Sequence, residues 1–265
     1  MTFRLQNFLW ATVLFFISCD DGDNASVRPA ATDKETILKN EMATYPDSLL
    51  LVENIIQFYR ENGNIDRAVK VTNEAIKRDS INARLWDIKA TLLFEKEDTS
   101  GSIAAFEKAI EIFPEPAYII SLGTLYAQTQ NPNALVMSDA LLAGSKANAD
   151  KEAYFIKGLY YTYTGNKRKA IGFFDKCLAL NYTFMDAYLE KGLALYDLGL
   201  YKEAFAIFNR AVTLQNNFEE GYFYRGQCLE KLGRPAEAAE SYKRALLYDP
   251  GYAEASDALA KLGYK

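Results

Sequence analysis

The chain lacks the residue types that most nucleophilic and metal-dependent enzymes use. Its 265 residues include no histidine, so it offers no Ser–His or Cys–His pair and no imidazole ligand for a metal ion. No acidic pair stands out as a general acid and base, and the glycines recur at packing and turn positions rather than in a phosphate-binding loop. The sequence therefore predicts a protein that is not an enzyme and that has no cofactor or metal.

The charge balance narrows the class of partner. Lysine and arginine number 30 against 35 aspartates and glutamates, giving a net charge of −5. A nucleic-acid partner would require a basic stripe, which the sequence does not show. The basic run Lys167-Arg168-Lys169 follows a predicted turn. We expect this run to be solvated; a patch for lipid head groups or for an acidic partner is the alternative.

Residues 1–18 have the features of a targeting segment. Arg4 gives a positive start, and the apolar run from Phe8 to Ile17 is shorter than the roughly 20 residues that a membrane-spanning helix needs. The sequence Phe16-Ile17-Ser18-Cys19 resembles a bacterial lipobox, with phenylalanine in place of the usual leucine. This resemblance implies cleavage before Cys19 and lipidation of Cys19; an ordinary signal peptide is the alternative.

Residues 19–32 are polar, with Val27 as the single bulky apolar residue, and are expected to form a flexible tether between the lipid and the fold. Acidic residues directly after the lipidated cysteine resemble an inner-membrane retention signal in some bacteria and a surface-export signal in others. The sequence does not decide between the two signals. Of the bacterial membranes we favour the outer one and leave its leaflet open.

An internal repeat organises the rest of the chain. The stretch from Met185 to Tyr252 divides into two 34-residue units, and a period of this length is typical of a stacked array. The units match at Tyr188/Tyr222, Gly192/Gly226, Leu195/Leu229, Gly199/Gly233, Ala204/Ala238, Phe208/Tyr242, Ala211/Ala245 and Asn216/Pro250. The spacing predicts two amphipathic helices in each unit. Gly199 and Gly233 lie between the helices, where a left-handed backbone favours glycine.

This pattern of large and small residues resembles the tetratricopeptide repeat (TPR). The resemblance implies an all-α, right-handed α-solenoid of about six helix-turn-helix repeats with N- and C-terminal capping helices, extending over residues 33–265. The expected repeats are 49–82, 83–115, 116–150, 151–184, 185–218 and 219–252, followed by a cap at 253–262. A first capping helix should extend from about Asp33 to Thr44. We expect no domain boundary within the array, because neighbouring repeats share one core.

The repeat at 116–150 departs most from the pattern. Its first helix fits, but Leu135 and Leu142 occupy positions in the second helix where small residues are expected. Cys177 and Cys228 lie two repeats apart, at a separation of about 20 Å for helices packed 8–10 Å from each other. A disulfide requires Cα atoms within about 7 Å, so both cysteines are expected to be buried small residues.

The family resemblance also implies where a partner would bind. In TPR proteins the first helices line an inner groove, chiefly through repeat positions 2, 5, 9, 12 and 13. The C-terminal half would present Phe155, Leu159, Tyr163, Leu189, Leu193, Tyr196, Phe223 and Gln227, with Glu152, Asp186 and Glu220 along one rim. The N-terminal half is more polar, with Glu53, Gln57, Arg60, Asp87 and Thr91. The family's carboxylate-clamp residues are missing at the matching positions, so that activity is not implied.

We therefore expect a non-catalytic adaptor or assembly factor of the bacterial cell envelope, anchored to a membrane by its lipid. Its groove would bind an apolar or amphipathic segment of another envelope protein or peptide. Three alternatives stay open. The groove residues pack between repeats, or they are covered by the chain's own N-terminal segment or by a second copy in a homodimer, or the groove encloses a lipid or glycan as a small-molecule carrier.

Overall fold

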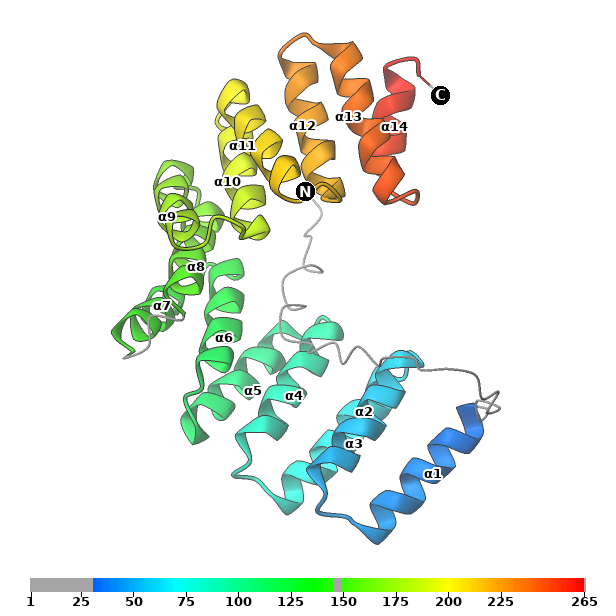
Figure 1. Ribbon diagram of the computed structural model, residues 1–265. Coiled ribbons are helices and arrows are strands. Elements are labelled where there is room, and N and C mark those ends of the chain that lie inside the picture. The colour runs from blue at the N-terminus through cyan, green and yellow to red at the C-terminus, as the bar shows by residue number, and fades with distance from the viewer. Residues whose placement is uncertain (1–30, 145–148, 265) are drawn as a thin grey trace. The chain divides into compact units, whose positions relative to one another are not determined.

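The structure is a computed structural model that describes residues 31–144 and 149–264. In these residues the chain forms fourteen helices and no strand, and from α1 to α5 and from α7 to α14 each helix packs against the next (Figure 1). The prediction of an all-α fold is confirmed. The targeting segment, Cys19 and the first part of the tether lie outside the described residues. None of the helices in 31–144 and 149–264 has the length and the apolar run that crossing a bilayer needs.

The chain divides into two compact units, with the division between Leu122 and Gly123. Unit 1 contains α1 (Ala31–Thr44), α2 (Leu49–Glu61), α3 (Ile65–Arg78), α4 (Ala83–Glu95), α5 (Thr99–Ile112) and the first half of α6 (Pro116–Gln128). Unit 2 contains the rest of α6 and then α7 (Asn133–Ala143), α8 (Asp150–Tyr163), α9 (Lys167–Leu180), α10 (Met185–Asp197), α11 (Tyr201–Leu214), α12 (Glu219–Lys231), α13 (Pro235–Tyr248) and α14 (Ala253–Lys261). A core shared by all the repeats predicts no such boundary. The division falls in the repeat whose sequence departs most from the pattern.

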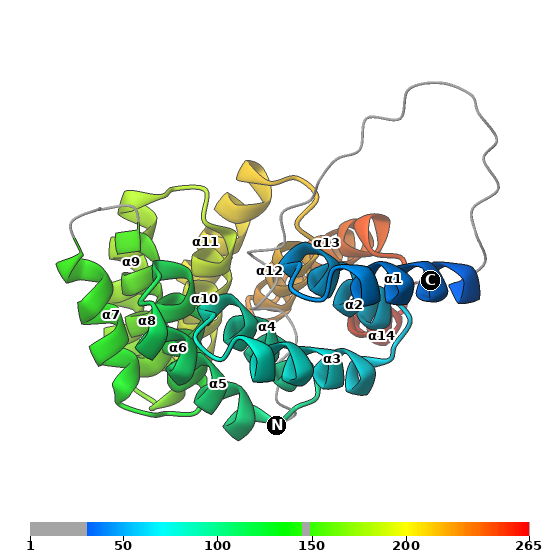
Figure 2. The same cartoon turned by 90° about the horizontal axis from the view of Figure 1, so that it is seen from below.

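The core of unit 2 is shared between neighbouring hairpins. Phe208 of α11 packs in one cluster with Leu195 of α10 and with Cys228, which belongs to the next hairpin. A hairpin of two helices cannot bury its apolar face alone, so each one completes the core of its neighbour. Figure 2, which views the molecule from below, shows the successive helices α7 to α10 beside one another.

Close approach of the helices within a hairpin depends on glycine. In three successive hairpins the glycine of the first helix lies against an aromatic ring of the second: Gly158 against Phe174, Gly192 against Phe208 and Gly226 against Tyr242. A Cβ atom on these glycines would stand 2.3, 2.4 and 2.5 Å from the nearest ring carbon. The small residue of the first helix and the large residue of the second are therefore in direct contact in each of these hairpins.

The turns between the paired helices also follow the sequence. Gly199 and Gly233 have φ angles of 74° and 72°, in the left-handed region that was predicted for them. Two other hairpins place a residue with a side chain in the same conformation, Glu97 at 62° and Gln130 at 58°. Those two turns are strained by comparison.

Helix α7 corrects one expectation. Its fully buried small residues are Ala134 and Ser138, whereas Leu135 and Leu142 are only partly buried. The prediction that these leucines occupy the small-residue positions is wrong. The physical reason is a shift of register: the buried small residue comes one position closer to the turn residue Gln130 than the equivalent alanine does in the regular hairpins.

Candidate functional site

The first helices of the three regular hairpins in unit 2, α8, α10 and α12, contain all the predicted groove residues. Five of the eight have partly exposed side chains: Tyr163, Leu189, Leu193, Tyr196 and Gln227. Three of these five lie on α10 with a spacing of four and then three residues, which places them on one face of that helix. We call Leu189, Leu193 and Tyr196 the α10 face.

Three predicted groove residues are buried instead. Phe155, Leu159 and Phe223 have exposed fractions of 4%, 0% and 5%, so the expectation that they contact a partner is corrected. An aromatic residue from the end of the same repeat covers each phenylalanine. The ring centroids of Phe155 and Phe184 are 5.0 Å apart, as are those of Phe223 and Tyr252. The two phenylalanine rings are therefore occupied by packing inside their own repeats.

Acidic residues border the α10 face. Asp186 and Glu190 lie one helical turn apart on α10, and Glu220 is on α12. Among the described residues, neither Asp186 nor Glu190 forms an ion pair or a hydrogen bond through its side chain. Burial raises the pKa of Glu190 to about 7, and the negative charges of Asp186 and Glu220 act in the same direction. Burial alone raises the pKa of Asp186.

Glu190 is not among the rim residues that the family resemblance implies. The signal was present, because Asp186 and Glu190 are like charges four residues apart on a predicted helix, a spacing at which they repel each other. Tyr163 of α8 lies near enough to Glu190 to feel its charge. Burial, with the Glu190 charge adding to it, raises the pKa of its phenol to about 12. Tyr163 therefore remains protonated and can donate a hydrogen bond.

The third predicted rim residue has a different environment. The Glu152 Oε1 atom lies 3.2 Å from Nζ of its neighbour Lys151, while Oε2 is buried with no hydrogen-bond partner in the described part of the chain. Glu152 therefore does not share the arrangement of Asp186 and Glu190. The unneutralised acids of this face are concentrated on α10.

In unit 1 the charged side chains of the first helices form ion pairs with one another. Arg84 donates to Glu53 at 2.9 Å and to Asp87 at 2.8 Å, and Arg60 pairs with Glu95. The pairs Arg84–Glu53 and Arg60–Glu95 join neighbouring hairpins of unit 1, and the pair Arg84–Asp87 lies within α4. The polar residues predicted there are thus largely engaged with one another, which leaves the α10 face and its acids as the stronger candidate.

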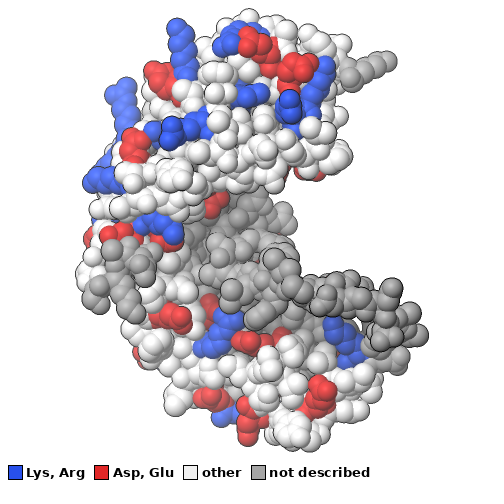
Figure 3. All heavy atoms as spheres, in the orientation of Figure 1, with Lys and Arg blue, Asp and Glu red and all other residues white. Residues whose placement is uncertain are grey.

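The remaining sequence candidates serve packing or pair within the chain. Cys177 and Cys228 are free thiols with no exposed surface, as predicted. In the basic run, Lys167 forms an ion pair with Asp197 at 2.7 Å, and Lys169 donates to a tyrosine hydroxyl. On the visible face of unit 2, basic and acidic residues are interspersed rather than gathered into a stripe (Figure 3).

Comparison with known sequences decides the family. A sequence model described as "Tetratricopeptide repeat" matches residues 219–252, and a second with the same description matches residues 57–115 and 157–217. These matches cover more than half of the chain. The chain belongs to the tetratricopeptide repeat family. A search of curated proteins finds no match.

Solved structures agree with the TPR fold. A tetratricopeptide repeat protein from Parabacteroides merdae is 19% identical with a TM-score of 0.70, and the alignment covers 88% of this chain and 92% of that one. PilW, titled a type IV pilus biogenesis factor, is 18% identical with a TM-score of 0.66 over 79% and 97% of the two chains. The Cut9–Hcn1 structure of the APC/C is 18% identical with a TM-score of 0.61 over 88% and 46%. The predicted TPR solenoid is confirmed, and this fold implies a role in protein–protein interaction.

Proposed function

We propose that this TPR protein is an adaptor or assembly factor of the bacterial cell envelope, anchored to a membrane through lipidated Cys19. Its α10 face binds an amphipathic segment of another envelope protein, with basic residues beside the apolar ones. The main observation in support is the juxtaposition on α10 of partly exposed apolar side chains with two carboxyl groups that have no cationic partner among the described residues.

The electrostatics favour a basic partner. Burial raises the pKa of both Asp186 and Glu190, and for Glu190 the negative charge of Asp186 adds to the effect. A lysine or arginine side chain placed between them would relieve both effects and form charge-assisted hydrogen bonds. Apolar residues of the same segment would cover Leu193 and Tyr196, in the manner of a helix in a groove. Tyrosine is also a frequent binding hot spot.

The architecture and the predicted anchor support an assembly role. A stack of hairpins holds the α10 face in place before the partner arrives, which lowers the entropy cost of binding. A lipid at Cys19 would keep this face close to membrane-bound partners and raise its effective concentration. The structural likeness to PilW makes the assembly of a surface apparatus, such as a pilus, a fitting context.

The binding face can be tested by cross-linking in intact cells. A photo-reactive residue in place of Tyr196 should capture a protein, and the captured peptide should be amphipathic and basic. Combining Leu193→Ser with Glu190→Gln should reduce the capture of that protein. A matched control combines Ala206→Ser with Glu203→Gln on α11, where both residues are exposed, and should leave capture unchanged. Undiminished capture by a folded Leu193/Glu190 variant would refute the assignment of the face. A lipid or glycan retained by the purified protein would favour the carrier instead.

The anchor needs a separate test, because it does not depend on the α10 face. Labelled fatty acid supplied to cells should be incorporated into the wild-type protein and not into a Cys19→Ala variant. The variant should also leave the membrane fraction. If the wild-type protein incorporates no fatty acid, the anchor is wrong while the binding face is still open to the cross-linking test.

A further inference from the structure

A row of ion pairs joins the hairpins of unit 2 on the side of their second helices. Lys157 of α8 contacts Asp139 of α7 at 2.6 Å, and Lys191 of α10 contacts Asp175 of α9 at 2.5 Å. In each case a cation from the first helix of a hairpin is neutralised by an aspartate from the second helix of the preceding hairpin. The lysines are largely buried and the aspartates are more exposed.

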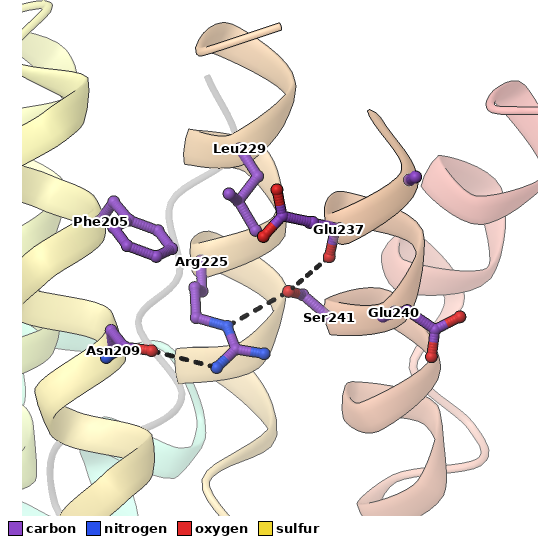
Figure 4. Close-up of a pocket in the computed structure, with 8 residues that line it drawn as sticks. Phe205, Asn209, Arg225, Leu229, Glu237, Glu240 and Ser241 are labelled. Atoms are coloured by element: carbon purple, nitrogen blue, oxygen red, sulfur yellow. Dashed lines mark hydrogen bonds between the residues drawn. The ribbon is translucent and has the colours of Figure 1, made fainter. Parts of the chain in front are cut away.

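The next pair in this row lacks its carboxylate. Arg225 of α12 corresponds to Lys191, and Asn209 of α11 corresponds to Asp175, each 34 residues further along the chain. The Arg225 Nη1 atom donates to the Asn209 side-chain oxygen at 3.3 Å, and Nε donates to Ser241 Oγ at 3.2 Å (Figure 4). In the part of the chain that the structure describes, no carboxylate contacts Arg225 and Nη2 has no hydrogen-bond partner.

A pocket of about 380 Å³ opens at this place, between α11, α12 and α13. Phe205 and Leu229 supply its apolar wall, and Arg225 is among the residues that line it (Figure 4). Two glutamates also line the pocket, but each has its own cation. Glu237 accepts two hydrogen bonds of 2.6 Å from Arg234, and Glu240 pairs with Lys243 at 3.0 Å. Their charges are therefore largely offset.

The positive charge of the Arg225 guanidinium is only partly compensated by its surroundings. Burial lowers its pKa from the ordinary value, and the positive charge of Arg244 acts in the same direction. Tyr222, whose ring centroid lies 5.0 Å from the guanidinium carbon, and the charge of Glu237 act the other way but do not reverse the shift. Burying part of a cation without an anion beside it costs free energy. In the two preceding pairs the aspartates remove this cost for the lysines. An anion from outside the chain would remove it here.

We propose that this pocket binds the carboxylate of an aspartate or glutamate side chain from a partner polypeptide. The incoming carboxylate accepts from the Nη2 atom of Arg225, beside Asn209, and supplies the negative charge that Asp139 and Asp175 supply in the other two pairs. An apolar residue beside it packs on Phe205 and Leu229. A carboxylate fits better than a phosphate, because one negative charge is enough to neutralise the single guanidinium, as one aspartate does for one lysine in the two preceding pairs. This site lies apart from the α10 face and does not depend on the function proposed for it.

The test is an NMR titration of the full-length protein with the dipeptide N-acetyl-Leu-Glu-amide at constant ionic strength. The side-chain Nε–Hε signal of Arg225 should shift and saturate. Asn209→Asp supplies the missing carboxylate from the chain itself. It should weaken binding of the dipeptide by about tenfold or more, which corresponds to about 1.4 kcal/mol of binding free energy. The matched control is Asn217→Asp, which adds the same charge at an exposed position of unit 2 and should leave binding unchanged.

Asn209→Asp should fold, because the same residue is accommodated at the equivalent position 175; circular dichroism verifies this. Equal affinity of the dipeptide for the wild-type and Asn209→Asp proteins would overturn the proposal, as would the absence of a saturable shift in the wild-type protein. Inorganic phosphate is titrated in parallel. Tighter binding of phosphate than of the dipeptide would overturn the assignment of a carboxylate ligand.

Discussion

Phe208 of α11 lies over Gly192 of α10 so closely that a Cβ atom on residue 192 would stand 2.4 Å from Cζ of the ring. Phe208 has no exposed surface, so the ring cannot turn out into solvent. We therefore expect Gly192→Ala to lower the free energy of unfolding by about 1–3 kcal/mol, the usual cost of an overpacked core. Urea denaturation followed by circular dichroism measures this loss.

The chain provides a matched control in Gly172, which lies inside α9. Apart from its chain neighbours and the nearby backbone of its own helix, no atom lies within 4 Å of the place that its Cβ would occupy. Gly172→Ala should raise the free energy of unfolding by up to about 1 kcal/mol, because alanine favours the helix over glycine. If the two substitutions had the same effect, the close packing of residue 192 would not be the cause.

The turn between α4 and α5 should be improved by glycine. Glu97 adopts a φ of 62°, a conformation that the regular hairpins assign to glycine. Glu97→Gly should raise the thermal midpoint by a few degrees, corresponding to about 1 kcal/mol of relieved backbone strain. Ala104→Gly, at an exposed position inside α5, should instead destabilise the protein by about 1 kcal/mol. A loss of stability in Glu97→Gly would contradict this account.

The helices and their tight contacts follow from the sequence because they depend on local patterns. Gly192 predicts a close approach and Gly199 predicts a left-handed turn, since each requirement excludes nearly every other residue. The register of α7 could not be predicted in this way. It is fixed by the fit of Ala134 and Ser138 against neighbouring helices, and that fit overrides the count of residues from the start of the repeat.

The candidate site was only partly predictable. Repeat position 5 predicts Phe155 and Phe223 on the inner face, but whether such a ring is open to a partner depends on an aromatic residue some 30 positions later that packs over it. The lack of a carboxylate partner for Arg225 among the described residues could not be predicted either. The absence of a carboxylate can be recognised only when the hairpins are compared in the structure. Asp175 pairs with Lys191, and this pair shows that Asn209 occupies the position of the missing aspartate.

Glu190 should make stability depend on pH. Its pKa is about 7 in the folded chain against an ordinary value of 4.5, so between these values the unfolded chain releases the proton while the folded chain retains it. The free energy of unfolding therefore falls as pH rises from about 4.5 to 7, by roughly 1–3 kcal/mol for this group. Glu190→Gln removes the titrating proton. The variant should be more stable than the wild-type protein at pH 8 by this amount, as urea denaturation at pH 5 and pH 8 will show.

Glu203→Gln on α11 is the control for this effect, because Glu203 is exposed. It should change the unfolding free energy by less than about 0.5 kcal/mol at either pH. If Glu203→Gln raised the free energy of unfolding at pH 8 as much as Glu190→Gln does, net charge rather than the environment of Glu190 would set the pH dependence.

Cys177 and Cys228 should react with thiol reagents only when unit 2 opens. Both side chains are fully buried, and burial raises the pKa of each thiol to about 12. At pH 8 only about one thiol in ten thousand would be ionised, and the thiolate is the reacting form. Iodoacetamide should therefore modify both residues slowly in the native protein and rapidly in urea, with mass spectrometry assigning the peptides. The new thiol of a Ser256→Cys variant, at an exposed position of α14, should react at once under native conditions. Native labelling of Cys177 at the rate of that thiol would show that the surroundings of Cys177 are open in solution.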